Sequence, residues 1–305
     1  MRDPRFFQPD GFRWGNFTNI AGRNIRTGHM PGEGPRLFIL QGFRENIEQY
    51  FEVIREQSAL GYDILTLDWP GQGESDRYIP EDPQRSHHEG YGEIIATLHQ
   101  FTQNAPSSQK PALMLAHSMG GHIGLRYLRE HPGFFRAAAI SAPMIDINTG
   151  MPKWMARLVV ALMGGAASTR YVPGGGPWTP DEDVFETNHL THDPTRYRAR
   201  TEIYRNNEKL QMGDVTVGWV CHTLRSVGIL QDEAYLKSIK TPVLMEISGE
   251  EKIVGRAAAV RAAALLPDCR RVDISPAKHA IWLEQDAWRN LWRAEIDAFF
   301  RAAGA

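Results

Sequence analysis

Hydrophobic and polar residues follow two different rhythms along the chain between residues 36 and 140. Short apolar runs, such as the one at 37–40, predict buried strands. Between these runs the apolar residues recur at helical spacing, as they do at positions 47, 50, 51 and 54. Strands that alternate with amphipathic helices are typical of βαβ units. The pattern therefore predicts an α/β fold, with a mostly parallel central sheet flanked by helices.

The elements that these patterns predict extend over most of the chain. Predicted strands cover residues 37–40, 62–67, 112–115, 137–140, 242–247 and 271–274. Predicted helices cover residues 47–54, 89–101, 257–266 and 288–299. Two further runs, 12–17 and 24–29, are separated by Gly22 and predict an antiparallel hairpin at the edge of the sheet.

This rhythm stops after Pro143 and resumes near Lys240. The residues between are rich in Gly, Pro, Trp and Met, with helical patterns at 155–163 and 196–209 and no clear strand. We therefore expect one core domain built from residues 1–143 and 241–305. Residues 144–240 are predicted to form a helical cap, inserted after the sixth strand.

Composition narrows the class of protein. The chain has 305 residues, of which 42% are hydrophobic and 23% charged, so it can bury a large core without metals or disulfides. A net charge of −2 leaves no basic surface for nucleic acid, which we do not expect as a partner. The two cysteines, Cys221 and Cys269, lie far apart, which favours reduced thiols and a reducing compartment.

The expected location is the cytoplasm. The first residues are charged and polar rather than apolar, unlike a secretory signal. No run approaches the about 18 apolar residues that span a bilayer. A peripheral contact between the cap and the inner membrane, and the oligomeric state, stay open.

A candidate nucleophile follows the predicted strand at 112–115. Residues 116–121 read Ala-His-Ser-Met-Gly-Gly, which places Ser118 between a strand and a helix with small residues two positions to either side. Such a sharp turn exposes the serine hydroxyl at the helix N-terminus, where negative charge is stabilised. Ser118 is therefore predicted to act as a nucleophile, the alternative being a tight turn with a solvated serine.

The oxyanion that forms on attack by Ser118 needs two backbone N–H donors directed at it. One predicted donor is the N–H of Met119, directly after Ser118. The second is the N–H of Phe43, in the loop after the strand at 37–40, where Gly42 allows close backbone approach. The alternative is an ordinary strand-to-helix loop.

A general base is sought among eleven histidines. His279 follows the last predicted strand and precedes the last helix, as the chain order Ser, acid, His requires. His117 is expected to point away from Ser118. His189 and His192 have H-x-x-H spacing but no third spaced ligand, so no metal site and no cofactor are expected.

The acid that orients the base should follow the predicted strand at 242–247. That loop contains Glu250 and Glu251 but no aspartate, so the acid is predicted to be a glutamate. Asp146, after the preceding strand, is a third candidate.

These motifs together resemble the lysophospholipase and monoacylglycerol-lipase family of α/β-hydrolases. Residues 41–45, Gln-Gly-Phe-Arg-Glu, are similar to its H-G-x-x-E motif, and residues 68–75, Asp-Trp-Pro-Gly-Gln-Gly-Glu-Ser, to its D-x-x-G-x-G-x-S motif. Residues 117–121 match G-H-S-M-G-G from its histidine onward, and residues 251–254, Glu-Lys-Ile-Val, align with D-R-I-V. That alignment is the reason for preferring Glu251. Gln41 in place of histidine resembles the bacterial lysophospholipase branch, as do 188–193 and 218–220 in the cap.

The resemblance implies hydrolysis of an acyl ester, such as a lysophospholipid, by the triad Ser118, Glu251 and His279. We expect Gln41 and Gly42 to contact the substrate, together with Trp154 and Trp219 of the cap. An apolar stripe at 154–163 either lines an acyl channel or packs on the core. An amidase or aminopeptidase with an acidic pocket (Glu182, Asp183 and Glu186) is a second hypothesis. A binding protein without catalysis is the third.

Overall fold

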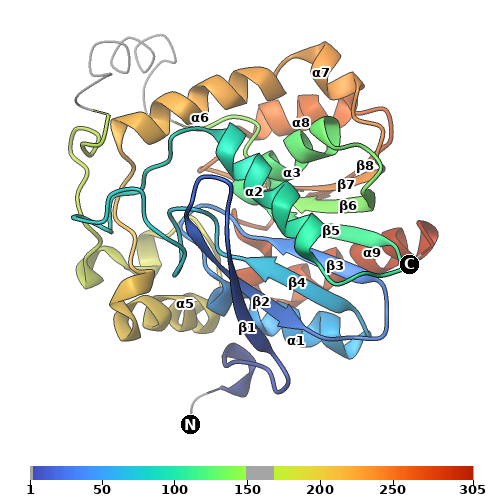
Figure 1. Ribbon diagram of the computed structural model, residues 1–305, viewed down its shortest axis with the longest axis horizontal. Helices are drawn as coiled ribbons and strands as arrows, with labels where there is room; N and C mark the ends of the chain where they lie inside the picture. The colour runs from blue at the N-terminus through green and yellow to red at the C-terminus, as the bar shows by residue number, and fades with distance from the viewer. Residues whose placement is uncertain (1–2, 149–167, 305) are drawn as a thin grey trace.

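The computed structural model describes residues 3–148 and 168–304 of the chain (Figure 1). Its centre is an eight-stranded sheet in the order β1-β2-β4-β3-β5-β6-β7-β8. The strands are β1 (Arg13–Thr18), β2 (Asn24–Met30), β3 (Arg36–Leu40), β4 (Asp63–Leu67), β5 (Ala112–His117), β6 (Phe135–Ser141), β7 (Val243–Ser248) and β8 (Cys269–Ile274). Strands β3 to β8 are parallel, whereas β1 and β2 form an antiparallel hairpin at one edge. The predicted parallel sheet and edge hairpin are confirmed.

Helices cover both faces of this sheet because successive side chains of a strand point to opposite faces. Phe38 and Leu40 pack into one apolar core, and Leu37 and Ile39 into the other. The first core is covered by α2 (Tyr91–Asn104), α3 (Met119–Glu130) and α8 (Arg256–Leu265). The second core is covered by α1 (Phe51–Ala59) and α9 (Asp286–Ala302), which lie behind the sheet in Figure 1. All four strand residues are fully buried, so the sheet is a rigid base for its loops.

Between β6 and β7 the described residues form helices and loops and contribute no strand to the sheet. The α-helices there are α5 (Pro194–Asn206), α6 (Val217–Leu230) and α7 (Glu233–Lys237). The helix predicted at 196–209 begins earlier, because Asp193 caps it and Pro194 occupies its first turn, and it ends at Asn206. The helix predicted at 155–163 lies outside the described residues.

The parallel register brings four loops to one edge of the sheet. Strands β3, β5, β7 and β8 all end there, and the loop after each carries one group of candidate residues. The loops after β7 and β8 are also hydrogen-bonded to each other, through Gly249 N to Ile274 O at 3.1 Å and Glu250 N to Ala277 O at 2.9 Å. Residues far apart in the sequence therefore meet at this carboxyl edge.

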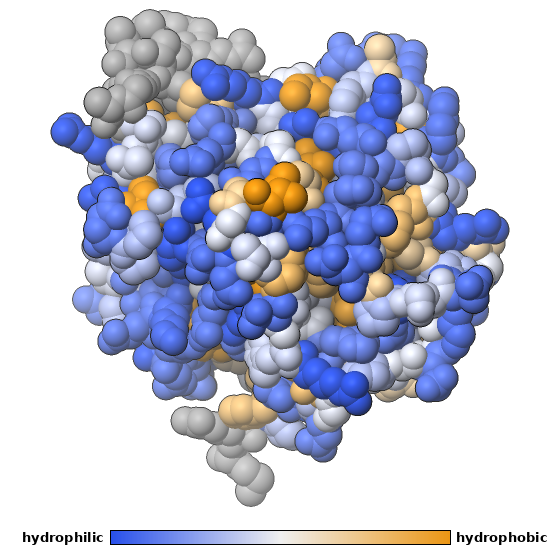
Figure 2. All heavy atoms as spheres, viewed as in Figure 1, coloured by the Kyte–Doolittle hydropathy of each residue, from blue (hydrophilic) through white to orange (hydrophobic). Residues whose placement is uncertain are grey.

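The surface shown in Figure 2 is largely hydrophilic, with apolar residues in small separate spots. The most exposed large apolar side chains, Ile20, Leu60 and Leu291, belong to different elements. Among the described residues, no helix has the length and apolar character needed to cross a membrane.

Candidate active site

Ser118 occupies a strained turn between β5 and α3. Its φ of 51° lies in the left-handed region, which L-residues other than glycine rarely adopt. Gly120 permits the turn, since a Cβ there would lie 2.3 Å from Leu40 O and 2.5 Å from Gln41 O. The start of α3 therefore packs directly on the end of β3, and the serine is held at the helix N-terminus.

The structure brings the three predicted triad residues together. His279 Nε2 lies 2.9 Å from Ser118 Oγ, and His279 Nδ1 lies 2.7 Å from Glu251 Oε2. A carboxylate can only accept, so Nδ1 carries the hydrogen and Nε2 is left to accept from the serine hydroxyl. Ser118 and His279 are 5% and 4% exposed, so this chain of hydrogen bonds is shielded from bulk water.

The two alternative acids lie elsewhere. Glu250 points to the opposite side of its loop, where its Oε2 lies 3.3 Å from His192 Nε2. The Asp146 carboxylate accepts from the N–H of Ile147 at 3.0 Å. Asp146 packs closely on Gly255, where an added Cβ would lie 2.7 Å from the Cβ of Asp146. The Glu251 carboxylate, in contrast, lies 2.7 Å from His279 Nδ1.

Two buried carboxyl groups in this region, Glu246 and Glu251, differ in charge. Burial acts to raise the pKa of Glu251, but the hydrogen bond from His279 and the N–H groups of Ile253 and Val254 lower it overall. Burial raises the pKa of Glu246 to about 8, so Glu246 is protonated near neutral pH. Of these two carboxyl groups, Glu251 is therefore the one that carries a negative charge next to His279.

The predicted oxyanion donors are available. Met119 is the first residue of α3, so its N–H has no acceptor within the helix. Within 3–148 and 168–304, neither this N–H nor that of Phe43 donates a hydrogen bond to the chain. The neighbouring Arg44 N–H, in contrast, donates to Gln72 at 2.9 Å.

Hydrogen bonds of polar side chains fix the loop that carries Phe43. Gln41 is fully buried and donates to Thr66 Oγ1 at 3.0 Å. The Gly42 N–H donates to the Glu45 carboxylate, which also accepts from Tyr50 at 2.6 Å. Because the Gln41 side chain is turned into the sheet, any contact it makes with substrate would come from its backbone. Its predicted role in substrate binding stays a prediction, as does that of Gly42.

His117 lies closer to the site than its sequence position indicated. Its ring centre is 4.8 Å from that of His279, and its Nδ1 is 3.0 Å from Ser141 Oγ. The expectation that it points away from Ser118 stays a prediction, but its ring does pack beside that of the base, His279. Burial lowers the pKa of His117 to about 4, so the ring is neutral beside His279. The Glu45 carboxylate, the last residue of the motif at 41–45, lies 3.5 Å from His117 Nε2. This glutamate was the one feature of the sequence that could have indicated where His117 lies.

The predicted cap residues are placed in part. Trp219, on α6, is 7% exposed, and its ring packs 4.7 Å from that of Phe43. Trp154 and the stripe at 154–163 lie outside the described residues. Asp183 accepts from Trp178 at 3.0 Å and pairs with Arg200 at 3.5 Å, so its charge is already compensated.

The two histidines of the H-x-x-H motif lie in different surroundings. His189 is exposed, whereas His192 contacts two carboxylates, Glu250 and Glu284. In the part of the chain that the structure describes, no group of three His, Cys, Asp or Glu residues could hold a metal ion.

The mostly parallel sheet, the serine turn after β5 and the histidine loop after β8 define the class of this protein as an α/β-hydrolase. Residues 35–286 match the hydrolase family described as serine aminopeptidase, S33, and the chain belongs to that family.

Relatives that match more than four fifths of this chain confirm the resemblance to lysophospholipases. Lysophospholipase L2 of Escherichia coli K12 is 33% identical over 276 residues, which cover 86% of this chain and 79% of the relative. The probable lysophospholipase L2 of Haemophilus influenzae is 30% identical over 251 residues, covering 82% and 78%. A soluble variant of monoglyceride lipase from Saccharomyces cerevisiae has a similar fold, with a TM-score of 0.74, 17% identity and coverage of 96% and 94%.

Proposed function

We propose that this protein hydrolyses carboxylic esters with a fatty-acyl chain, through an acyl-enzyme on Ser118. The observation that carries the proposal is the hydrogen-bonded series from Glu251 to His279 at 2.7 Å and from His279 to Ser118 at 2.9 Å. A serine paired with a histidine that a carboxylate orients is the arrangement that activates a hydroxyl for acyl transfer.

Each group has one role in the proposed reaction. Ser118 Oγ attacks the ester carbonyl carbon while its proton passes to His279 Nε2. The resulting oxyanion accepts from the N–H groups of Phe43 and Met119, and Glu251 stabilises the imidazolium. The tetrahedral intermediate collapses, and the departing alcohol takes the proton from His279. Water then attacks the acyl-enzyme, again giving a proton to His279, and releases the fatty acid with Ser118 restored.

The proposed substrate is a single-chain lipid ester, either a lysophospholipid or a monoacylglycerol. The relatives named lysophospholipase L2 support the first, and the monoglyceride lipase of similar fold supports the second. We also propose that residues 144–240 act as a cap over the site. Trp219 supports this role, because its ring lies on Phe43 of the predicted oxyanion loop.

Two measurements on the purified chain test the proposal. A fluorophosphonate probe should label the native protein and the Ser58→Ala control but not Ser118→Ala. A panel of p-nitrophenyl esters, lysophospholipids and monoacylglycerols should then show ester hydrolysis. Turnover of aminoacyl amides alone would favour the aminopeptidase hypothesis, and absence of labelling would favour a binding protein. Sedimentation with anionic lipid vesicles tests the predicted peripheral membrane contact.

A further inference from the structure

A short segment between β6 and β7 lies against the loop that carries His279. We call residues 188–193 the strap; they connect a 3₁₀ turn (Phe185–Thr187) to α5. Asn188 shapes the strap, because its side-chain oxygen accepts from Leu190 N at 2.8 Å and Thr191 N at 2.9 Å. The strap is therefore an ordered element with its own internal hydrogen bonds.

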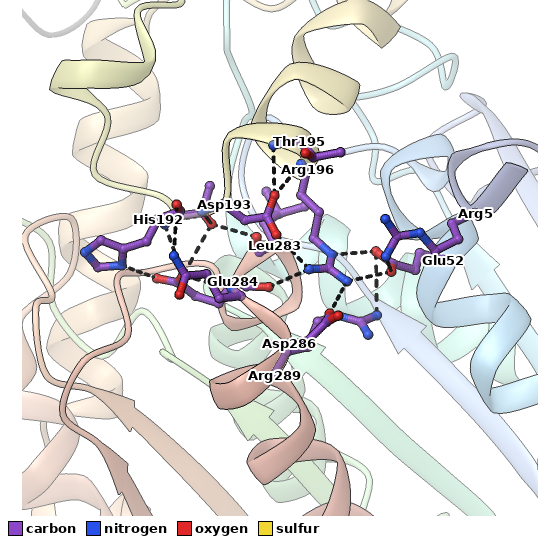
Figure 3. Close-up of polar contacts among 12 residues, drawn as sticks. Arg5, Glu52, His192, Asp193, Thr195, Arg196, Leu283, Glu284, Asp286 and Arg289 are labelled. Carbon is purple, nitrogen blue, oxygen red and sulfur yellow. Dashed lines mark hydrogen bonds and ion pairs between the residues drawn. The ribbon is translucent and has the colours of Figure 1, made fainter. Parts of the chain in front are cut away.

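The C-terminal end of the strap is fixed to the core by one buried cation (Figure 3). The Arg196 side chain is 2% exposed and donates to both carboxylate oxygens of Glu52 at 2.8 Å. It also donates to Asp193 at 2.9 Å, to the Glu284 carbonyl at 2.9 Å and to Asp286 at 2.6 Å. Since Glu52 lies on α1 and Asp286 on α9, the strap is tied to two helices behind the sheet.

Backbone and side-chain bonds join the strap to the histidine loop, residues 275–280. The N–H of Ala280 donates to Leu190 O at 2.9 Å, and that of His279 donates to His189 O at 3.4 Å. The ammonium group of Lys278 donates to Asn188 O at 3.1 Å. Three consecutive residues centred on His279 are thus held by the strap.

His192 links the histidine loop to the acid loop, residues 249–254. Its Nδ1 lies 2.9 Å from Glu284 Oε1, and the same oxygen accepts from Lys278 N at 2.8 Å. Its Nε2 lies 3.3 Å from Glu250 Oε2. The Glu284 side chain is fully buried, so this bridge is well shielded on one side. Lys278 directly precedes His279, and Glu250 directly precedes Glu251.

We propose that the strap is a positioning element for the triad, and that His192 is its key residue. His192 contacts Glu250, the neighbour of Glu251, and Glu284, which accepts from the neighbour of His279, so it fixes the two loops relative to each other. This inference rests on the proposed function. Catalytic groups tolerate little displacement, since a misplacement of about 1 Å can cost about 10²-fold in rate. Of the two histidines in the H-x-x-H motif, His192 is thus the one with a side-chain role, a bridge between two loops.

Variants at His192 test the bridge, with His29 as a matched control. Both histidine side chains are 26% exposed and contact a carboxylate, but His29 lies on β2, where it pairs with Asp63. His192→Ala should lower kcat for ester hydrolysis by about 10- to 100-fold and leave KM within about twofold. His29→Ala should leave both constants unchanged. The fold should tolerate His192→Ala, because Glu284 keeps the N–H donors of Lys278 and Gln285.

Two conservative variants separate the two contacts. Asparagine places an amide near the position of Nδ1 and keeps the contact with Glu284, whereas glutamine reaches the position of Nε2 and keeps that with Glu250. His192→Asn and His192→Gln should each restore part of kcat. If His192 affected stability alone, the loss of kcat in each variant would follow the drop in its melting temperature. That result would contradict a positioning role.

Amide hydrogen exchange gives a readout that does not depend on turnover. Exchange at Ala280 and at Glu250 should be faster in His192→Ala than in the native chain, with no change in His29→Ala. An active native enzyme whose kcat is equal in His192→Ala and His29→Ala overturns the strap proposal and leaves the proposed function intact. An inactive native chain with the expected exchange pattern overturns the proposed function, while the strap still orders the two loops.

Discussion

Glu251 binds His279 with one carboxylate oxygen and its own loop with the other. Oε2 lies 2.7 Å from His279 Nδ1, while Oε1 accepts from Ile253 N at 2.7 Å and Val254 N at 3.1 Å. The two backbone donors leave the carboxylate one orientation. An imidazole held against it is therefore restricted to one tautomer and one rotation.

Replacing this acid should nearly abolish turnover. Glu251→Gln presents an amide that can donate to Nδ1, which favours the tautomer that cannot accept from Ser118. We expect kcat to fall by about 10⁴-fold, as for loss of the acid in other triads. Glu250→Gln keeps an oxygen facing His192 and should cost less than about tenfold. Steady-state kinetics on a p-nitrophenyl ester measures both, and equal losses would reject Glu251 as the acid.

Glycine at position 120 is required by the packing of α3 on β3. Gly120→Ala would place a Cβ 2.3 Å from Leu40 O, which is backbone and cannot rotate away. We expect the free energy of unfolding to fall by about 1 to 3 kcal/mol. Labelling of Ser118 by the fluorophosphonate probe should also be lost. Gly228→Ala, in an open position on α6, should instead stabilise by about 0.5 to 1 kcal/mol. Urea unfolding of the two variants is the measurement; destabilisation by both would contradict this account.

Acid should weaken the packing of α6 on α3. Burial lowers the pKa of His122 from 6.5 to about 3. Its Nδ1 donates to Met144 O at 2.8 Å, and its Nε2 lies 2.6 Å from Ser226 on α6. The unfolded chain gains this proton near pH 6.5 and the folded chain only near pH 3, so stability falls as the pH drops between these values.

The slope of that loss should approach about 1.4 kcal/mol per pH unit for this one group. Urea unfolding between pH 7.5 and pH 5 measures it. His122→Asn keeps a donor for Met144 but does not titrate, so its stability should depend less steeply on pH. His189→Asn, at an exposed side chain, serves as the control. An unchanged slope in His122→Asn would contradict the prediction.

Removing the cation that anchors the strap should destabilise the fold. Arg196→Met leaves Glu52, whose side chain is 8% exposed, without its bidentate partner. The expected cost is about 3 to 5 kcal/mol, as for one partner of a buried pair. Lys237→Met removes an ion pair of 2.6 Å, but that lysine is 58% exposed, and the melting temperature should not change. Thermal unfolding compares the two variants; similar effects would mean that Arg196 is not a buried anchor.

The pH dependence of Arg196→Met provides a second check. Burial acts to raise the pKa of Glu52, but the hydrogen bonds from Arg196 and the charge of Arg289 lower it below 4.5 overall. This contribution to stability is present above pH 4.5 and is lost as the pH falls further. The difference between the native chain and Arg196→Met should therefore shrink in acid.

Most of the fold could be predicted because its strands are continuous apolar runs. The run at 37–40 is buried on both faces of the sheet, which is the environment that such a pattern indicates. The hairpin at 12–29 could be predicted from its turn residues. Its apolar pattern is a weaker guide, because β1 is largely exposed whereas β2 is partly buried. The start of α5 was missed, because the capping by Asp193 decides it rather than the apolar spacing.

The site could be predicted only where chain order and local motifs define it. Ser118 and His279 follow from the turn and from the order of strands, whereas the choice of Glu251 over its neighbour depended on a family motif. The orientation of His117 and the bridge made by His192 depend on contacts with residues distant in the sequence. The contact between His192 and Glu284 spans 92 positions, a distance at which no periodicity carries information.

The Ser118 hydroxyl and the imidazole it needs are 161 positions apart. While the chain is being synthesised, β3, β5 and β6 can pair and the serine turn can form well before His279 leaves the ribosome. The nucleophile has no base during that interval. A nascent or truncated chain that ends before residue 279 would therefore lack the base that the proposed hydrolysis requires.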